Sequence, residues 1–235
     1  MKKTIVAMLA VCAFAFNAFA DHTPEHKTNN MKAAAHEHAA DAKAAGQEKA
    51  AEAKKTEMKL PPGMTAEQME EAMKLGAPSD AHKKLSAFEG KWTYTGKFWM
   101  DPKQKKPEMM TGTSENTWVL GGRYLKAKAM GEASKDWPAF EGIGFTGYDN
   151  VKQEYTSIWM DNMTTSAMTA TASFDDKAKT LTEKGTYHCP MKKSEQTYRS
   201  IWKVKGKDAY QYVSYMQDDN GKEYKAMEIE YRRAK

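Results

Sequence analysis

The 235-residue chain has little cysteine, and its two copies are Cys12 and Cys189. Cys12 lies in the apolar run that starts the chain, so Cys189 has no partner for a disulfide in the remainder. The sequence also contains no Cys-x-x-Cys or His-x-x-His pair, the kind of spacing that marks structural zinc sites. A disulfide framework and a motif-built zinc site are therefore both excluded.

Strong net charge and catalytic signatures are also absent. The formal charge is +5, and it falls to +3 without Lys2 and Lys3, so neither nucleic acid nor an acidic membrane surface is an expected partner. No phosphate-binding loop, nucleophile elbow or zinc-protease motif occurs. Asp161 and Glu228 could form a carboxylate pair, but their spacing does not require it. An enzyme is the weakest of three functional interpretations, and no cofactor can be identified.

The only long apolar run is at the beginning. Lys2 and Lys3 precede an uncharged run over residues 5–16, and Ala18-Phe19-Ala20 supplies small residues for cleavage after Ala20. This order is typical of a secretory signal peptide over residues 1–20. The run is shorter than the roughly 20 residues that span a bilayer, so no stable membrane insertion is expected. We expect a periplasmic or secreted protein.

Residues 21–59 contain no Val, Ile, Leu, Phe, Trp or Tyr. Such a segment cannot bury enough apolar surface to offset its ordering entropy, although Ala, Lys and Glu favour helix locally. The sequence predicts a disordered or frayed-helical tether there. Residues 60–88 follow as a short helical lead-in, with a capping box from Thr65 to Gln68, a stop at Gly76, and a second turn that starts at Ser79.

Alternation of apolar and polar residues dominates residues 89–235. It recurs in ten segments, separated by turn signals such as Gly121-Gly122, Asp149-Asn150 and Asn220-Gly221, with no long helix between them. Ten such segments at even spacing predict an all-β domain, an antiparallel up-and-down β-barrel whose closure removes exposed edges.

Specific motifs add a family resemblance over residues 82–233. The segments "HKKLSAFEGKW", "NTWVLGGRYLKAKAMG" and "FEGIGFTGYDNVKQEYTSIWMDNM" resemble the bacterial domain of unknown function 1579 family, and "GKW" is similar to the G-x-W motif of the calycin barrels. The resemblance implies a barrel with one open mouth, in which Trp92 plugs the closed end and a late arginine, Arg232 or its neighbour Arg233, stacks on it. The family brings no known activity.

A barrel of eight to ten strands holds side chains or one small ligand. Aromatic residues and charges in the middle of predicted strands favour a pocket for a small apolar or amphiphilic molecule, with an expected pair between Arg199 and Glu228. The candidate ligand-binding residues are Trp118, Arg123, Tyr155, Trp159, Asp161, Arg199 and Glu228. The alternative is that the aromatics fill the core and the charges point outward, because alternation does not tell which face is inside.

A second interpretation is a copper- or zinc-handling protein. His188, Cys189 and Met191 are soft or borderline ligands on one short segment, and His22 would stand beside a free amine after cleavage. Neighbouring residues on a turn rarely aim three side chains at one point, so we expect a surface loop here. An exposed Cys189 thiol could link two molecules into a dimer.

Overall fold

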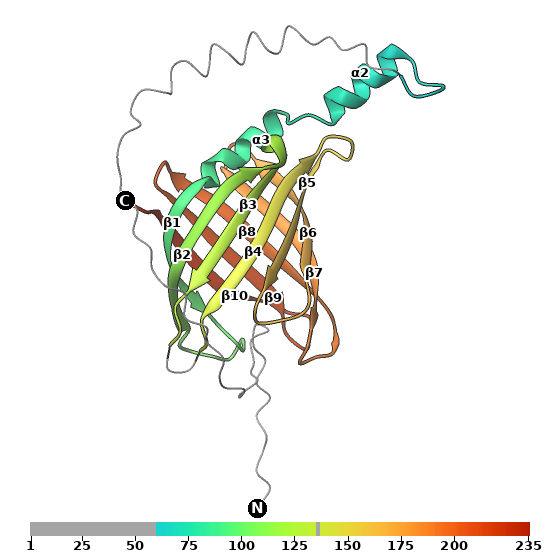
Figure 1. Ribbon diagram of the computed structural model, residues 1–235. Helices are drawn as coiled ribbons and strands as arrows, with labels where there is room; N and C mark the ends of the chain where they lie inside the picture. The colour runs from blue at the N-terminus through green and yellow to red at the C-terminus, as the bar shows by residue number, and fades with distance from the viewer. Residues whose placement is uncertain (1–59, 135–136) are drawn as a thin grey trace, which may run out of the picture. The chain divides into compact units, whose positions relative to one another are not determined.

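In the part of the chain that the structure describes, residues 60–134 and 137–235 of a computed structural model, ten antiparallel strands close into one barrel (Figure 1). Each strand pairs with its neighbours in sequence, and β1 pairs with β10. The strands are Gly90–Phe98 (β1), Glu108–Val119 (β2), Tyr124–Gly131 (β3), Phe140–Asp149 (β4), Glu154–Asp161 (β5), Met168–Asp175 (β6), Thr180–Cys189 (β7), Ser194–Gly206 (β8), Ala209–Gln217 (β9) and Glu223–Arg233 (β10). The predicted up-and-down barrel is confirmed.

Nine of the ten segments found by alternation coincide with strands; β2 extends well beyond its predicted core at residues 116–120. The first half of β2 has weak alternation because its inward positions include Gly112 and Ser114. A side chain at Gly112 would overlap the ring of Tyr94 and the carbonyl of Met130, so the position must stay small. Because Gly112 must stay small for close packing, the first half of β2 lacks the apolar alternation by which strands are predicted.

One end of the barrel is closed by short connections and a helical plug. Helix α3 (Asp80–Lys84) runs into the 3₁₀ turn η1 (Leu85–Phe88), which leads directly into β1. Another 3₁₀ turn, η2 (Leu120–Gly122), joins β2 to β3. Leu85 and Phe88 of this plug are almost fully buried. The longer described loops, over residues 99–107 and 162–167, lie at the opposite end, the mouth.

Trp92 lies at the closed end, 1% exposed. Its ring contacts Tyr210 edge-on at 4.7 Å between centroids, and its indole nitrogen donates to the Phe88 carbonyl at 3.0 Å. The arginine that covers it is Arg233, whose guanidinium lies 4.2 Å from the ring, and not Arg232. Tyr231 is buried, so strand alternation turns Arg232 outward and Arg233 inward. The choice of Arg232 was wrong by one residue.

Helix α2 (Ala66–Leu75) precedes the plug and has no buried residue. The predicted capping box is confirmed, because Thr65 and Gln68 exchange hydrogen bonds of 2.9 and 3.2 Å. The unit that contains the barrel begins at Lys74. No helix among the described residues is long and apolar enough to cross a membrane. The expected signal peptide and tether lie outside the described residues.

Replacing Trp92 by alanine is expected to lower the free energy of unfolding by about 3–5 kcal/mol, the range for truncating a buried aromatic. Trp99→Ala is the matched control, because Trp99 follows β1 and its ring lies near the Lys225 ammonium, 4.7 Å from the centroid. It should cost less than half as much. Denaturant titration measures both values, and equal losses would contradict the assignment of Trp92 to the plug.

Candidate functional site in the barrel interior

A buried carboxylate, that of Glu183 in β7, forms the most unusual polar feature of the interior. Glu183 is 5% exposed and accepts three hydrogen bonds from neutral donors. Ser157 donates to Oε1 at 3.0 Å, while Ser200 and the Trp202 indole donate to Oε2 at 2.5 and 2.8 Å. We call these four residues, with Tyr212 and Ser214, the Glu183 cluster.

Strand register brings the cluster together. Glu183 pairs with Ser200 across β7 and β8, and Ser200 pairs with Ser214 across β8 and β9. Trp202 follows Ser200 by two positions, so both side chains point inward. Ser157 reaches the carboxylate from β5, on the other side of β6. Four strands thus converge on one acidic group.

Two tyrosines, Tyr212 in the cluster and Tyr198 beside it, are held neutral. Burial first, and the Glu183 charge second, raise the pKa of Tyr212 to about 12. The same two causes, in the same order, hold the pKa of Tyr198 well above its usual value. Tyr212 is in hydrogen-bonding reach of Ser214 and Ser200. Both phenols therefore remain uncharged at neutral pH and add no second negative charge beside Glu183.

None of the ion pairs among the described residues involves Glu183. The expected interior cation, Arg199, points outward: its guanidinium makes bonds of 2.9 and 2.6 Å to Glu223 and stacks 4.1 Å from the Tyr215 ring. Tyr198 and Ser200 are buried inside, so alternation puts Arg199 outside. The predicted pair of Arg199 with Glu228 is wrong.

Glu228 is likewise on the outer face, because Met227 and Ile229 point inward. It accepts hydrogen bonds from Lys225 and from Gln211. Asp161 lies inside, so the suggested carboxylate pair of Asp161 and Glu228 does not exist. Arg123 is also outside the interior, at the closed end, where it donates to the carbonyls of Gly76 and Leu120 at 2.8 and 3.2 Å.

The remaining four candidates do point inward. Tyr155 is 3% exposed and donates to the Ala81 carbonyl at 2.8 Å, so it secures the plug. Trp118 packs on the same core. Trp159 stacks near Phe140 and donates to Asp161 at 3.0 Å, at the mouth end of β5. The three aromatic candidates and Asp161 therefore lie inside the barrel as expected, whereas Arg123, Arg199 and Glu228 do not.

Several inward side chains in the middle of the barrel are only half-buried. They include Tyr212 and Ala127, which lie on paired strands between the two ends, and Trp202, which lies nearer the floor. A side chain that points toward the barrel axis can retain accessible surface only if it borders an internal space. Ten strands also enclose a wider interior than eight. This accessible surface is what an incompletely filled interior would leave on these side chains.

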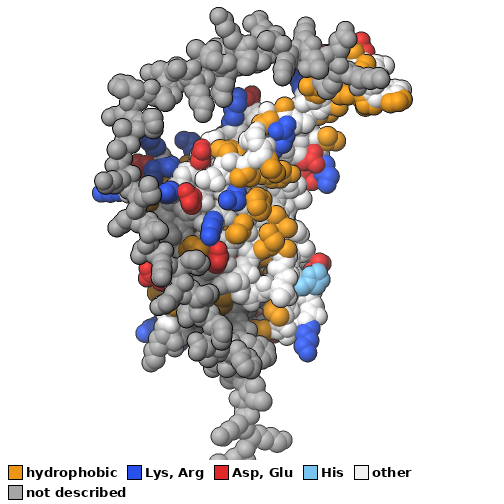
Figure 2. All heavy atoms as spheres, in the orientation of Figure 1, with side chains coloured by type: hydrophobic (Ala, Val, Ile, Leu, Met, Phe, Trp, Pro, Cys, Tyr) orange, Lys and Arg blue, Asp and Glu red, His pale blue; other side chains and the backbone are white. Residues whose placement is uncertain are grey.

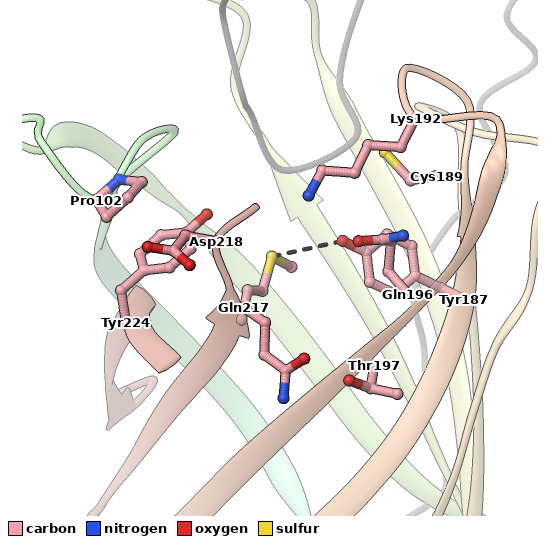
Figure 3. Close-up of a pocket in the computed structure, with 10 residues that line it drawn as sticks. Pro102, Tyr187, Cys189, Lys192, Gln196, Thr197, Gln217, Asp218 and Tyr224 are labelled. Atoms are coloured by element: carbon pink, nitrogen blue, oxygen red, sulfur yellow. Dashed lines mark hydrogen bonds between the residues drawn. The ribbon is translucent and has the colours of Figure 1, made fainter. Parts of the chain in front are cut away.

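The segment with soft metal ligands lies at the mouth (Figure 3). Cys189 ends β7 and is 5% exposed, which corrects the expectation of an exposed thiol in a loop. His188 is on the opposite, outer face, and Met191 is 45% exposed in the turn that follows. Alternation thus separates His188 from Cys189, and no group of three or more His, Cys, Asp or Glu among the described residues could hold a metal. His22 lies outside them.

Two hollows are defined at the surface. A cavity of about 20 Å³ at the mouth is bordered by Cys189, Lys192, Met216 and Tyr224. A wider one of about 520 Å³ lies on the outer face of β4 to β7, beside Tyr124, Phe145 and Ile158. In Figure 2, hydrophobic side chains gather in a patch on the visible face of the barrel. Of the Glu183 cluster, Ser157 borders the wider hollow, and none of the other members borders either one.

A family model described as "Protein of unknown function (DUF1579)" matches residues 77–233. Among solved structures, the crystal structure of Rv2717c from M. tuberculosis is similar at a TM-score of 0.53 and 12% identity, covering 68% of this chain and 100% of that chain. A redesigned β-barrel, b11L5F_LGL, has a TM-score of 0.36 at 12% identity, covering 65% and 96%. The first likeness shows a shared fold alone. No curated protein matches the chain.

Glu183→Leu is expected to lower the free energy of unfolding by about 2–4 kcal/mol, because the Trp202 indole and two serines lose their acceptor. Glu183→Gln keeps an oxygen for Trp202 and Ser200 and can donate to Ser157, so it should stay within about 1 kcal/mol of the parent. Urea unfolding of both variants measures the difference. A leucine variant as stable as the parent would mean that the donors find other partners.

Proposed function

We propose that this chain, which belongs to the DUF1579 family of proteins of unknown function, binds a small amphiphilic molecule inside its barrel. The observation that carries the proposal is the accessible surface on inward side chains in the middle of the barrel. A closed ten-stranded sheet can enclose one small molecule, and sites of this kind are concave, mostly apolar and provided with few polar groups.

The composition of the interior supports an amphiphile over a purely apolar ligand. Apolar walls come from aromatic and methionine side chains packed around the core, including Met110, Phe140, Trp159 and Met227. The Glu183 cluster supplies polar groups at one place among them. A molecule with one polar end and one apolar end matches this division.

We also propose that the protein acts outside the cytoplasm. Support comes from residues 1–20, whose basic start, apolar run and Ala18-Phe19-Ala20 fit a secretory signal peptide. Separation of periplasm from cytosol, followed by N-terminal sequencing of the mature chain, tests this part, and Asp21 is the expected first residue.

Binding can be tested with Nile red, an uncharged apolar dye whose emission rises in apolar surroundings. The parent protein should show saturable binding of about one dye per chain. Ala127→Phe should weaken that binding at least tenfold, because Ala127 points inward between Asn116 and Gly144 and retains accessible surface. A phenylalanine there occupies the internal space.

Thr113→Phe is the matched control, since Thr113 is exposed on the outer face of β2. It should leave dye binding unchanged. Thermal unfolding followed by circular dichroism confirms that both variants fold, and Ala127→Leu serves if the larger side chain prevents folding. No saturable binding by the parent, or equal losses in the two variants, would overturn the proposal.

A further inference from the structure

We infer that the molecule bound inside the barrel carries a cationic group, an amine or ammonium, that pairs with Glu183. This inference rests on the proposed function, since it specifies the ligand of the same site. Its basis is a charge imbalance: the interior holds a buried carboxylate that the protein supplies with hydrogen bonds but not with a positive charge.

The inward positions of the ten described strands carry charges of almost one sign. Glu183 and Asp161 point inward from β7 and β5. The one basic side chain at an inward position is Arg233, at the closed end. It is already engaged by Asp208 at 3.1 Å, by backbone carbonyls and by the Trp92 ring. Charges of one sign inside a cavity with low-dielectric walls produce a strong local electric field, which attracts a ligand of the opposite charge.

Nearby lysines and arginines do not compensate Glu183. Lys184 follows Glu183 in β7 and faces outward, as does its cross-strand partner Arg199. Arg199 is committed to Glu223. A buried carboxylate is costly unless it is paired with a cation or neutralised. A cationic ligand would remove that cost on binding and gain affinity from doing so.

The Glu183 carboxylate has acceptor capacity for one more donor. A carboxylate has about four acceptor positions, and Ser157, Ser200 and Trp202 occupy three of them. Two aromatic rings of the cluster, those of Trp202 and Tyr212, pack against each other beside the carboxylate, 4.4 Å apart between centroids. Such faces attract ammonium groups as well. The Glu183 carboxylate and the quadrupoles of the two rings thus both favour an ammonium head group.

The interior also sets the direction of the ligand. Trp202 contacts the aromatic floor of the barrel, with Phe88 at 6.1 Å and Tyr210 at 6.0 Å between centroids. The head group at Glu183 would therefore lie near the floor. Toward the mouth, inward positions carry apolar side chains such as Met168, at the start of β6, and Phe98, at the end of β1. An apolar tail would extend in that direction.

Three probes with the same ten-carbon tail test the inference: decylamine, decanol and decanoate, titrated into the full chain by calorimetry below their aggregation concentrations at pH 7. Decylamine should bind at least tenfold more tightly than decanol, and decanoate should bind most weakly. Glu183→Gln should lower decylamine affinity at least tenfold and leave decanol affinity unchanged, because the amide keeps the hydrogen bonds and removes the charge.

Glu228→Gln provides the control, since this carboxylate faces outward beside Lys225. It should have no effect on any probe. Ala127→Phe should weaken decylamine and decanol alike. Thermal unfolding verifies that each variant is folded.

The outcomes separate the two proposals. If decanol or decanoate binds the parent as tightly as decylamine, or if Glu183→Gln leaves the preference for the amine intact, the inference fails while interior binding stands. If none of the probes binds the parent, interior binding of amphiphiles fails as well.

Discussion

The closure of the sheet is the constraint on which the other features depend. Pairing of β1 with β10 fixes the register all around the barrel, from Trp92 opposite Arg233 to Phe98 opposite Met227. In a closed sheet each side chain is inside or outside, and successive residues alternate without exception unless a bulge intervenes. One such irregularity lies between Lys225 and Met227, and it keeps Met227, Ile229 and Tyr231 on the inner face.

Closure also explains why the interior is chemically distinct from the outer surface. Basic residues are abundant in the chain, yet among the described strands they lie almost entirely on the outer face, where Lys128 and Arg199 meet acidic partners. The inner face combines aromatic rings, methionines and serines with the Glu183 carboxylate. Burial of that group without an ion pair costs free energy. A role in binding gives a physical reason for its presence.

Much of the fold could be predicted from the sequence, because alternation and turn residues act locally. The strands from β3 to β10 and the Thr65 capping box required no knowledge of tertiary contacts. The first half of β2 was not predicted. Gly112 must be small because the Tyr94 ring of β1 packs against it, and this contact cannot be read from local alternation. The site was less predictable. Alternation divides the residues of Ser194–Gly206 between two faces but does not tell which face is inside, so Arg199 was as good a candidate for an inward position as Ser200. Glu183 was missed altogether, although its spacing from Leu181 and Tyr187 places it on the same face as apolar residues, the one signal that could have identified it.

We propose that the barrel interior accepts a cationic amphiphile at Glu183. A crystal structure of the full chain with decylamine tests it most directly. The account predicts the amine nitrogen at hydrogen-bonding distance, roughly 2.7–3.2 Å, from a Glu183 carboxylate oxygen, with the alkyl tail directed to the mouth. Decylamine on the outer face of β4 to β7, or inside the barrel with its nitrogen at the mouth and its tail against Trp202, would contradict it.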